Sequence, residues 1–91
     1  MSILSQLQQQ FNEMVDFLSN RNNGIKPSNQ LKLKMYGLYK QATKGDATDK
    51  PSKFDMIATA KFMSWQKLSG MEPVTAMQQY IAEAQTLKLN R

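Results

Sequence analysis

Apolar residues recur every three or four positions along most of the chain, which is the spacing of one face of an α-helix. In residues 3–20 they are Leu4, Leu7, Phe11, Met14, Val15 and Leu18. A second stripe comprises Leu31, Met35, Leu38 and Ala42, and the last comprises Val74, Met77, Ile81 and Ala84. Residues 56–68 carry apolar side chains on two sides of a helix, and no segment shows the period of two that indicates a strand. The pattern predicts an all-α, antiparallel four-helix bundle.

Residues at the expected helix starts support these boundaries. Pro27, Ser28 and Asn29 open the second helix, and Asp55 precedes the third helix as a candidate N-cap, with Ser52 as an alternative. Serine and aspartate favour the N-cap position because their side-chain oxygens accept bonds from the first free N–H groups. Pro73 suits the first turn of the last helix. Residues 44–55 would then form an unusually long connection between the second and third helices.

Length and composition limit the class of protein. Ninety-one residues predict one domain, residues 1–91, and no run approaches the roughly 20 apolar residues of a membrane span. Residues 1–18 lack the basic start and unbroken apolar stretch of a signal peptide, so we expect a cytoplasmic protein. The absence of cysteine removes thiolate chemistry, and the absence of histidine removes the commonest general base and metal ligand. We therefore expect no catalytic residues and no metal site.

Positive charge is concentrated in the middle of the chain. The net charge is +5, and residues 26–67 carry nine lysines against Asp46, Asp49 and Asp55, a net +6. The three aspartates lie in or beside the long connection and are interpreted as turn and cap residues. A basic surface of this kind favours an anionic partner, although a solvated lysine-rich surface is the simpler interpretation.

Two tyrosines and a lysine lie close together on the second helix. Tyr36, Tyr39 and Lys40 are spaced i, i+3 and i+4, so they share one helix face beside the core stripe. Lys61 interrupts an apolar line on the third helix, and Tyr80 lies beside the core stripe of the fourth. Each residue alone is unremarkable on a helix surface, but together they suit a ligand with a flat ring and phosphates.

Three sequence segments resemble the acyl-CoA-binding protein family. The first, Tyr36 to Asp46, reads Tyr-x-x-Tyr-Lys-Gln-Ala-Thr-x-Gly-Asp, and the second, Ala60 to Trp65, retains its alanine, lysine and last tryptophan. The third, Ala76 to Ile81, reads Ala-x-x-x-Tyr-Ile. The spacings between the segments also fit, and the similarity runs from about Pro27 to Leu87.

The resemblance implies a single domain of the acyl-CoA-binding protein type. Such a protein would bind long-chain fatty acyl-CoA in the cytosol without catalysis, as a monomeric carrier and buffer, with no cofactor, no nucleic-acid partner and no stable membrane insertion. The matching positions imply that Tyr36, Tyr39, Lys40, Lys61 and Tyr80 surround the nucleotide and its phosphates. The ligand-binding set that we expect is Leu33, Tyr36, Gly37, Leu38, Tyr39, Lys40, Lys61 and Tyr80, with the acyl chain near Leu33.

The chain departs from the family pattern at several positions. Phe62 replaces a tryptophan, Ile57 stands where many members have a lysine, and Lys32 stands where an apolar groove residue is usual. Arg21 is a possible basic contact from the region of the first helix.

The sequence also allows two other interpretations of function. One is a nucleic-acid-binding module, whose binding would fall steeply with salt, and the other is a protein-docking module with no nucleotide preference.

Overall fold

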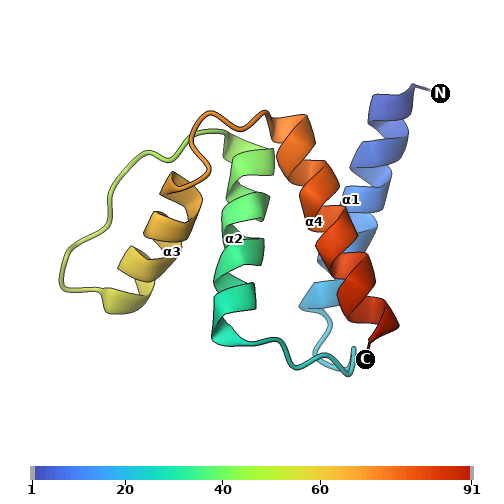
Figure 1. Ribbon diagram of the computed structural model, residues 1–91, viewed down its shortest axis with the longest axis horizontal. Coiled ribbons are helices and arrows are strands. Elements are labelled where there is room, and N and C mark those ends of the chain that lie inside the picture. The colour runs from blue at the N-terminus through green and yellow to red at the C-terminus, as the bar shows by residue number, and fades with distance from the viewer. Residues whose placement is uncertain (1, 91) are drawn as a thin grey trace.

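The computed structural model describes residues 2–90 and contains four α-helices in that range, with no strand. They are α1 (Ile3–Ser19), α2 (Asn29–Lys44), α3 (Met56–Gln66) and α4 (Pro73–Leu89). Figure 1 shows α3, α2 and α4 following one another across the molecule, with α1 beside α4. Among the helix pairs, α2 packs against α3 and α4, and α1 packs against α4. The predicted all-α four-helix fold is confirmed.

The directions of the helices do not alternate throughout. In Figure 1, α2 and α3 run in the same direction, and α4 runs opposite to both. The connection of residues 45–55 makes this possible. Eleven residues can extend over about 35 Å, and a helix of α3's eleven residues is only about 16 Å long. The chain therefore returns along the molecule before α3 begins, which corrects the expected antiparallel order at this pair.

Local hydrogen bonds explain where the helices start. The Ser28 hydroxyl oxygen accepts a bond of 3.1 Å from the Leu31 N–H at the start of α2. The Asp55 carboxylate accepts one of 2.9 Å from the Ala58 N–H, so Asp55, rather than Ser52, caps α3. Pro73 occupies the first turn of α4. The N-cap predicted for α3 and the start of α4 are confirmed, and the structure shows Ser28 as the N-cap of α2.

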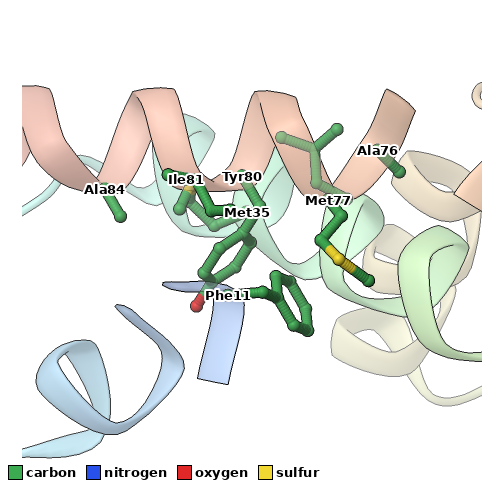
Figure 2. Close-up of a cluster of buried hydrophobic side chains, with 8 residues drawn as sticks. Phe11, Met35, Ala76, Met77, Tyr80, Ile81 and Ala84 are labelled. Atoms are coloured by element: carbon green, nitrogen blue, oxygen red, sulfur yellow. The ribbon is translucent and has the colours of Figure 1, made fainter. Parts of the chain in front are cut away.

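The core lies between α1, α2 and α4. Figure 2 shows Phe11 of α1 among side chains of α2 and α4, and the buried members of this cluster are Phe11, Met35, Leu38, Ala76, Met77, Tyr80, Ile81 and Ala84. Trp65 of α3 is also buried. Val74, expected in the last core stripe, is 38% exposed because it lies in the first turn of α4. None of the helices in residues 2–90 combines the length and hydropathy that crossing a bilayer requires.

Candidate ligand-binding site

A hollow between the four helices brings together most of the expected aromatic and basic residues. This central hollow has a volume of about 410 Å³. It is lined by Val15 and Ser19 of α1, Lys32, Met35, Tyr36 and Tyr39 of α2, Lys61 of α3 and Tyr80 of α4. Four of the expected ligand-binding residues therefore meet in one place, although they come from three different helices.

A second hollow, the lysine hollow, lies between α2, α3 and the 45–55 connection. Its volume is about 610 Å³. Its lining residues are Tyr36, Lys40, Lys44, Thr48, Asp49, Pro51, Asp55, Ile57, Ala58, Lys61, Phe62 and Trp65. Tyr36 and Lys61 line both hollows. The two hollows thus meet at an aromatic ring and an ammonium group, and a ligand occupying both could place a phosphate there.

Aromatic rings hold the two expected lysines in position. The Lys40 Nζ lies 4.9 Å from the centroid of the Trp65 ring, and the Lys61 Nζ lies 5.4 Å from that of Tyr36. Both distances suit a cation–π interaction, which restricts the side chain and leaves its N–H groups able to donate. Desolvation, followed by the nearby Lys44, lowers the pKa of Lys40. An anion bound beside Lys40 and Lys44 would counter the repulsion between their charges.

Three rings from different helices pack together, and two of them, Tyr39 and Tyr80, line the central hollow. The Phe11 ring stacks on Tyr39 at 6.0 Å between centroids and meets Tyr80 edge to face at 5.0 Å. Tyr39 is partly exposed, whereas Tyr80 is buried. Burial, followed by the nearby Tyr39, raises the pKa of Tyr80 to about 12. Like any tyrosine, Tyr80 is protonated at neutral pH, and its hydroxyl is able to donate a hydrogen bond.

The second half of the Tyr36–Asp46 segment serves the fold. Gln41 is fully buried, and its Nε2 donates to the Asp46 carboxylate and to the Met71 carbonyl, both at 2.9 Å. The same Asp46 oxygen accepts a bond of 2.8 Å from the Gly70 N–H. These bonds join the end of α2 to the turn before α4. Asp46 was interpreted from the sequence as a turn residue, but it also joins the end of α2 to the turn before α4.

Replacing Asp46 by asparagine should destabilise the protein in a pH-dependent way. The Gly70 N–H, followed by the Gln41 side chain, holds the pKa of Asp46 below its ordinary value of 3.8. Because the pKa of Asp46 is lower in the folded protein than in the unfolded chain, its negative charge stabilises the fold. This stabilisation is fully present above the pKa of the unfolded chain and is lost as the pH falls through the pKa of the folded protein. We expect the melting temperatures of the protein and Asp46→Asn to differ at pH 7 and to converge in acid, as the pH falls below 3.8 and through the folded-state pKa of Asp46. A difference that persists in acid would show that the negative charge is not responsible.

The tryptophan of α3 connects the fold to the lysine hollow. The Trp65 Nε1–H donates a bond of 2.7 Å to the Gly45 carbonyl, at the end of α2. Gly45 itself has a φ of +81°, a conformation that favours glycine and ends the helix. Because Trp65 also lies under Lys40, the bond fixes the ring on which that lysine rests.

The remaining three expected residues lie elsewhere. Gly37 and Leu38 are buried, and neither lines the central or the lysine hollow. A Cβ atom at Gly37 would lie 2.7 Å from the Ser64 carbonyl oxygen, so this glycine permits the close approach of α2 and α3. Leu33 and Leu38 line a separate hollow of about 390 Å³ with Leu68. The structure therefore does not bring Leu33 beside the tyrosines and lysines.

Several residues of the site were missed from the sequence. Val15 and Ser19 line the central hollow, and Phe11 supports two of its tyrosines, but all three looked like ordinary positions of an amphipathic helix. Lys44 lies four residues after Lys40, and that helical spacing was a usable signal.

A third hollow extends the site toward the end of α1. This end hollow has a volume of about 420 Å³ and shares Ser19, Lys32, Met35 and Tyr80 with the central hollow. Its other lining residues include Arg21 and the apolar Leu18, Ile25, Pro27 and Leu87. Arg21 thus lies in a hollow adjoining the tyrosines, but it does not line the central hollow itself. Within residues 2–90 no group of three acidic side chains could hold a metal ion.

The four helices and their adjoining hollows have the form of a small all-helical ligand-binding domain. The family described as "Acyl CoA binding protein" matches residues 8–84. The chain therefore belongs to the acyl-CoA-binding protein family, as the resemblance in its sequence predicted.

Individual relatives agree with this assignment. An acyl-CoA-binding protein homolog of Manduca sexta is 36% identical over 83 residues, which cover 89% of this chain and 90% of that protein. The crystal structure of Oryza sativa acyl-CoA-binding protein 2 superimposes with a TM-score of 0.82 at 32% identity, covering 92% of both chains. That of ACBP from Moniliophthora perniciosa gives a TM-score of 0.79 at 28% identity, covering 99% of this chain and 82% of that one.

Other relatives are much longer than the matched region. Acyl-CoA-binding domain-containing protein 1 of Arabidopsis thaliana is 53% identical over 57 residues, which cover 62% of this chain and 17% of that protein. Enoyl-CoA delta isomerase 2 of Rattus norvegicus is 45% identical over 56 residues, which cover 60% of this chain and 14% of that protein. The matched region is thus a small part of some proteins and nearly the whole of others.

Proposed function

We propose that this protein binds long-chain fatty acyl-CoA thioesters without chemical change and acts as a cytoplasmic acyl-CoA carrier and buffer. Residues 1–91 would form one binding domain and work as a monomer. Membership of the acyl-CoA-binding protein family supports the ligand class. The observation that carries the proposal within the structure is the meeting of two hollows at Tyr36 and Lys61.

The chemistry of the lining residues matches the parts of coenzyme A. The tyrosine rings of the central hollow offer faces for stacking against adenine, and its apolar members Val15 and Met35 cover the edges of such a ring. Lys40, Lys44 and Lys61 provide ammonium groups around the lysine hollow for phosphates. The Tyr80 hydroxyl, protonated at neutral pH, is available as a donor to the nucleotide.

Two of the expected residues, Gly37 and Leu38, would contribute by positioning the helices, and Leu33 would contribute by contact with the acyl chain. Gly37 keeps α2 and α3 close enough for Lys40 and Lys61 to reach one ligand. Leu38 belongs to the core that fixes the face of α2 carrying the tyrosines. Leu33 remains our candidate for contact with the acyl chain, which would have to pass from the lysine hollow across the start of α2.

The test of this function is calorimetric titration with palmitoyl-CoA, free coenzyme A and palmitate in parallel. We expect tight binding of the thioester, weaker binding of coenzyme A and little binding of palmitate, with the thioester recovered intact. Equal binding of palmitoyl-CoA and a short oligonucleotide would favour the nucleic-acid interpretation instead.

The affinity should depend on the length of the acyl chain. Each buried methylene group contributes up to about 0.8 kcal/mol, so shortening the chain by two should cost up to about 1.6 kcal/mol, roughly tenfold in affinity. The trend should flatten once the chain extends beyond its groove. Titration of acyl-CoAs from short to long measures this directly, and equal affinity for acetyl-CoA and palmitoyl-CoA would leave only a coenzyme A site.

A further inference from the structure

The start of α3 exposes three large apolar side chains within four residues. Phe54, Met56 and Ile57 are 86%, 82% and 73% exposed, and we refer to them as the apolar tip. Figure 1 shows that the start of α3 and the connection leading to it form the edge of the molecule farthest from α1. The core lies between α1, α2 and α4, so the apolar tip contributes nothing to it. A group of exposed apolar side chains at one edge of a small protein marks a surface for interaction.

The charges around the apolar tip are mainly positive. Lys53 lies beside it, with its Nζ 5.7 Å from the centroid of the Phe54 ring. The lysine hollow beside the tip is lined by Lys40, Lys44 and Lys61 against Asp49 and Asp55, a net +1, and Lys50 and Lys53 lie in the connection that leads to the tip. The Asp55 carboxylate is also engaged with the Ala58 N–H. Apolar side chains surrounded by lysines are typical of surfaces that rest on membranes containing anionic lipids.

The apolar tip is continuous with the lysine hollow. Ile57 lines that hollow together with Pro51 and Ala58, whereas Phe54 and Met56 lie outside all the hollows described above. A surface resting on the tip would therefore adjoin the mouth of the hollow.

We propose that the apolar tip docks this protein on phospholipid bilayers that contain anionic lipids. Phe54, Met56 and Ile57 enter the boundary between head groups and acyl chains, and the neighbouring lysines contact lipid phosphates. A bilayer accepts three projecting side chains without a fixed geometry, whereas a protein partner would need a matching pocket. Docking of this kind is peripheral and reversible, and it does not depend on the ligand proposed above.

The experiment is co-sedimentation of the protein with vesicles of phosphatidylcholine, alone or with about one third phosphatidylserine. The variant is Phe54→Ser with Met56→Ser, because neither side chain lines a hollow or belongs to the core. The matched control is Ile3→Ser with Leu4→Ser, which removes two apolar side chains that are 81% and 62% exposed at the start of α1.

We expect the unaltered protein and the control to bind the anionic vesicles equally and the neutral vesicles more weakly. The Phe54→Ser, Met56→Ser variant should bind the anionic vesicles about tenfold less well, while its melting temperature and its affinity for palmitoyl-CoA stay unchanged. Binding of this variant at the level of the unaltered protein would overturn the proposal, as would an equal loss in the control. Failure of the unaltered protein to bind anionic vesicles would overturn it too. The vesicle-binding results do not test acyl-CoA binding by the unaltered protein, which the calorimetric titration tests separately.

Discussion

Replacing Lys40 and Lys61 together by glutamine is expected to weaken acyl-CoA binding by about 3–6 kcal/mol, because each charge-assisted phosphate contact contributes about 1.5–3 kcal/mol. Lys40 rests over Trp65 and Lys61 over Tyr36, so both ammonium groups are held beside the region where the two hollows meet. Glutamine retains much of the aliphatic stem but loses the charge. Calorimetric titration of the single and double variants measures the loss.

The matched control for Lys61 is Lys67→Gln. Lys67 is also exposed and follows α3 directly, but it lines the hollow of Leu33 and Leu38 rather than the lysine hollow. We expect Lys67→Gln to bind acyl-CoA normally. Thermal stability should change little in any of these variants, since an exposed cation–π pair contributes only about 0.5–1 kcal/mol. A lysine whose replacement lowers the melting temperature and leaves affinity intact would have a structural role instead.

Replacing Phe11 by alanine is expected to lower the free energy of unfolding by about 3–5 kcal/mol, which is the usual cost of removing a buried phenylalanine. Phe11 is 2% exposed and contacts both Tyr39 and Tyr80. A loss of this size is a large part of the total stability of a small domain, about 5–15 kcal/mol. Chemical denaturation followed by circular dichroism measures it.

A milder change separates the contribution of Phe11 to stability from its effect on Tyr39 and Tyr80. Phe11→Leu should cost only about 1–2 kcal/mol and stay folded, yet it removes the ring that orients the two tyrosines. We expect its affinity for acyl-CoA to fall. The control is Phe17→Leu, because Phe17 is a half-buried ring on the same helix that lines none of the hollows and lies under Lys88. Equal affinities for the two leucine variants would mean that ligand binding by Tyr39 and Tyr80 does not depend on the Phe11 ring.

Features that depend on neighbouring residues could be predicted from the sequence. Asp55 caps α3 as expected because an N-cap bond joins residues only three apart. The pairing of Tyr36, Tyr39 and Lys40 on one face follows from helix geometry alone. The four helices were predicted for the same reason, since their apolar stripes have the helical period.

Features that depend on distant contacts could not be predicted in this way. The bond from Gln41 to Met71 spans thirty residues, and nothing in the period of α2 distinguishes Gln41 from an exposed glutamine. The close contact of Gly37 with Ser64 is equally remote in sequence. The direction of α3 depends on the path of a long polar connection, which its composition does not determine. Ile57 fits an apolar stripe but is exposed, because α3 packs on one neighbouring helix only.

That single contact of α3 has a consequence for local unfolding. Since α3 packs only against α2 among the helices, it can separate from the rest without disturbing the core between α1, α2 and α4. Segments of this kind open at a lower free energy than the whole molecule, and their amide hydrogens exchange with solvent sooner. A ligand that joined Lys61 of α3 to Lys40 of α2 would oppose this opening. Slower amide exchange in α3 of the protein with ligand than in α3 of the free protein would then show directly that the site is occupied.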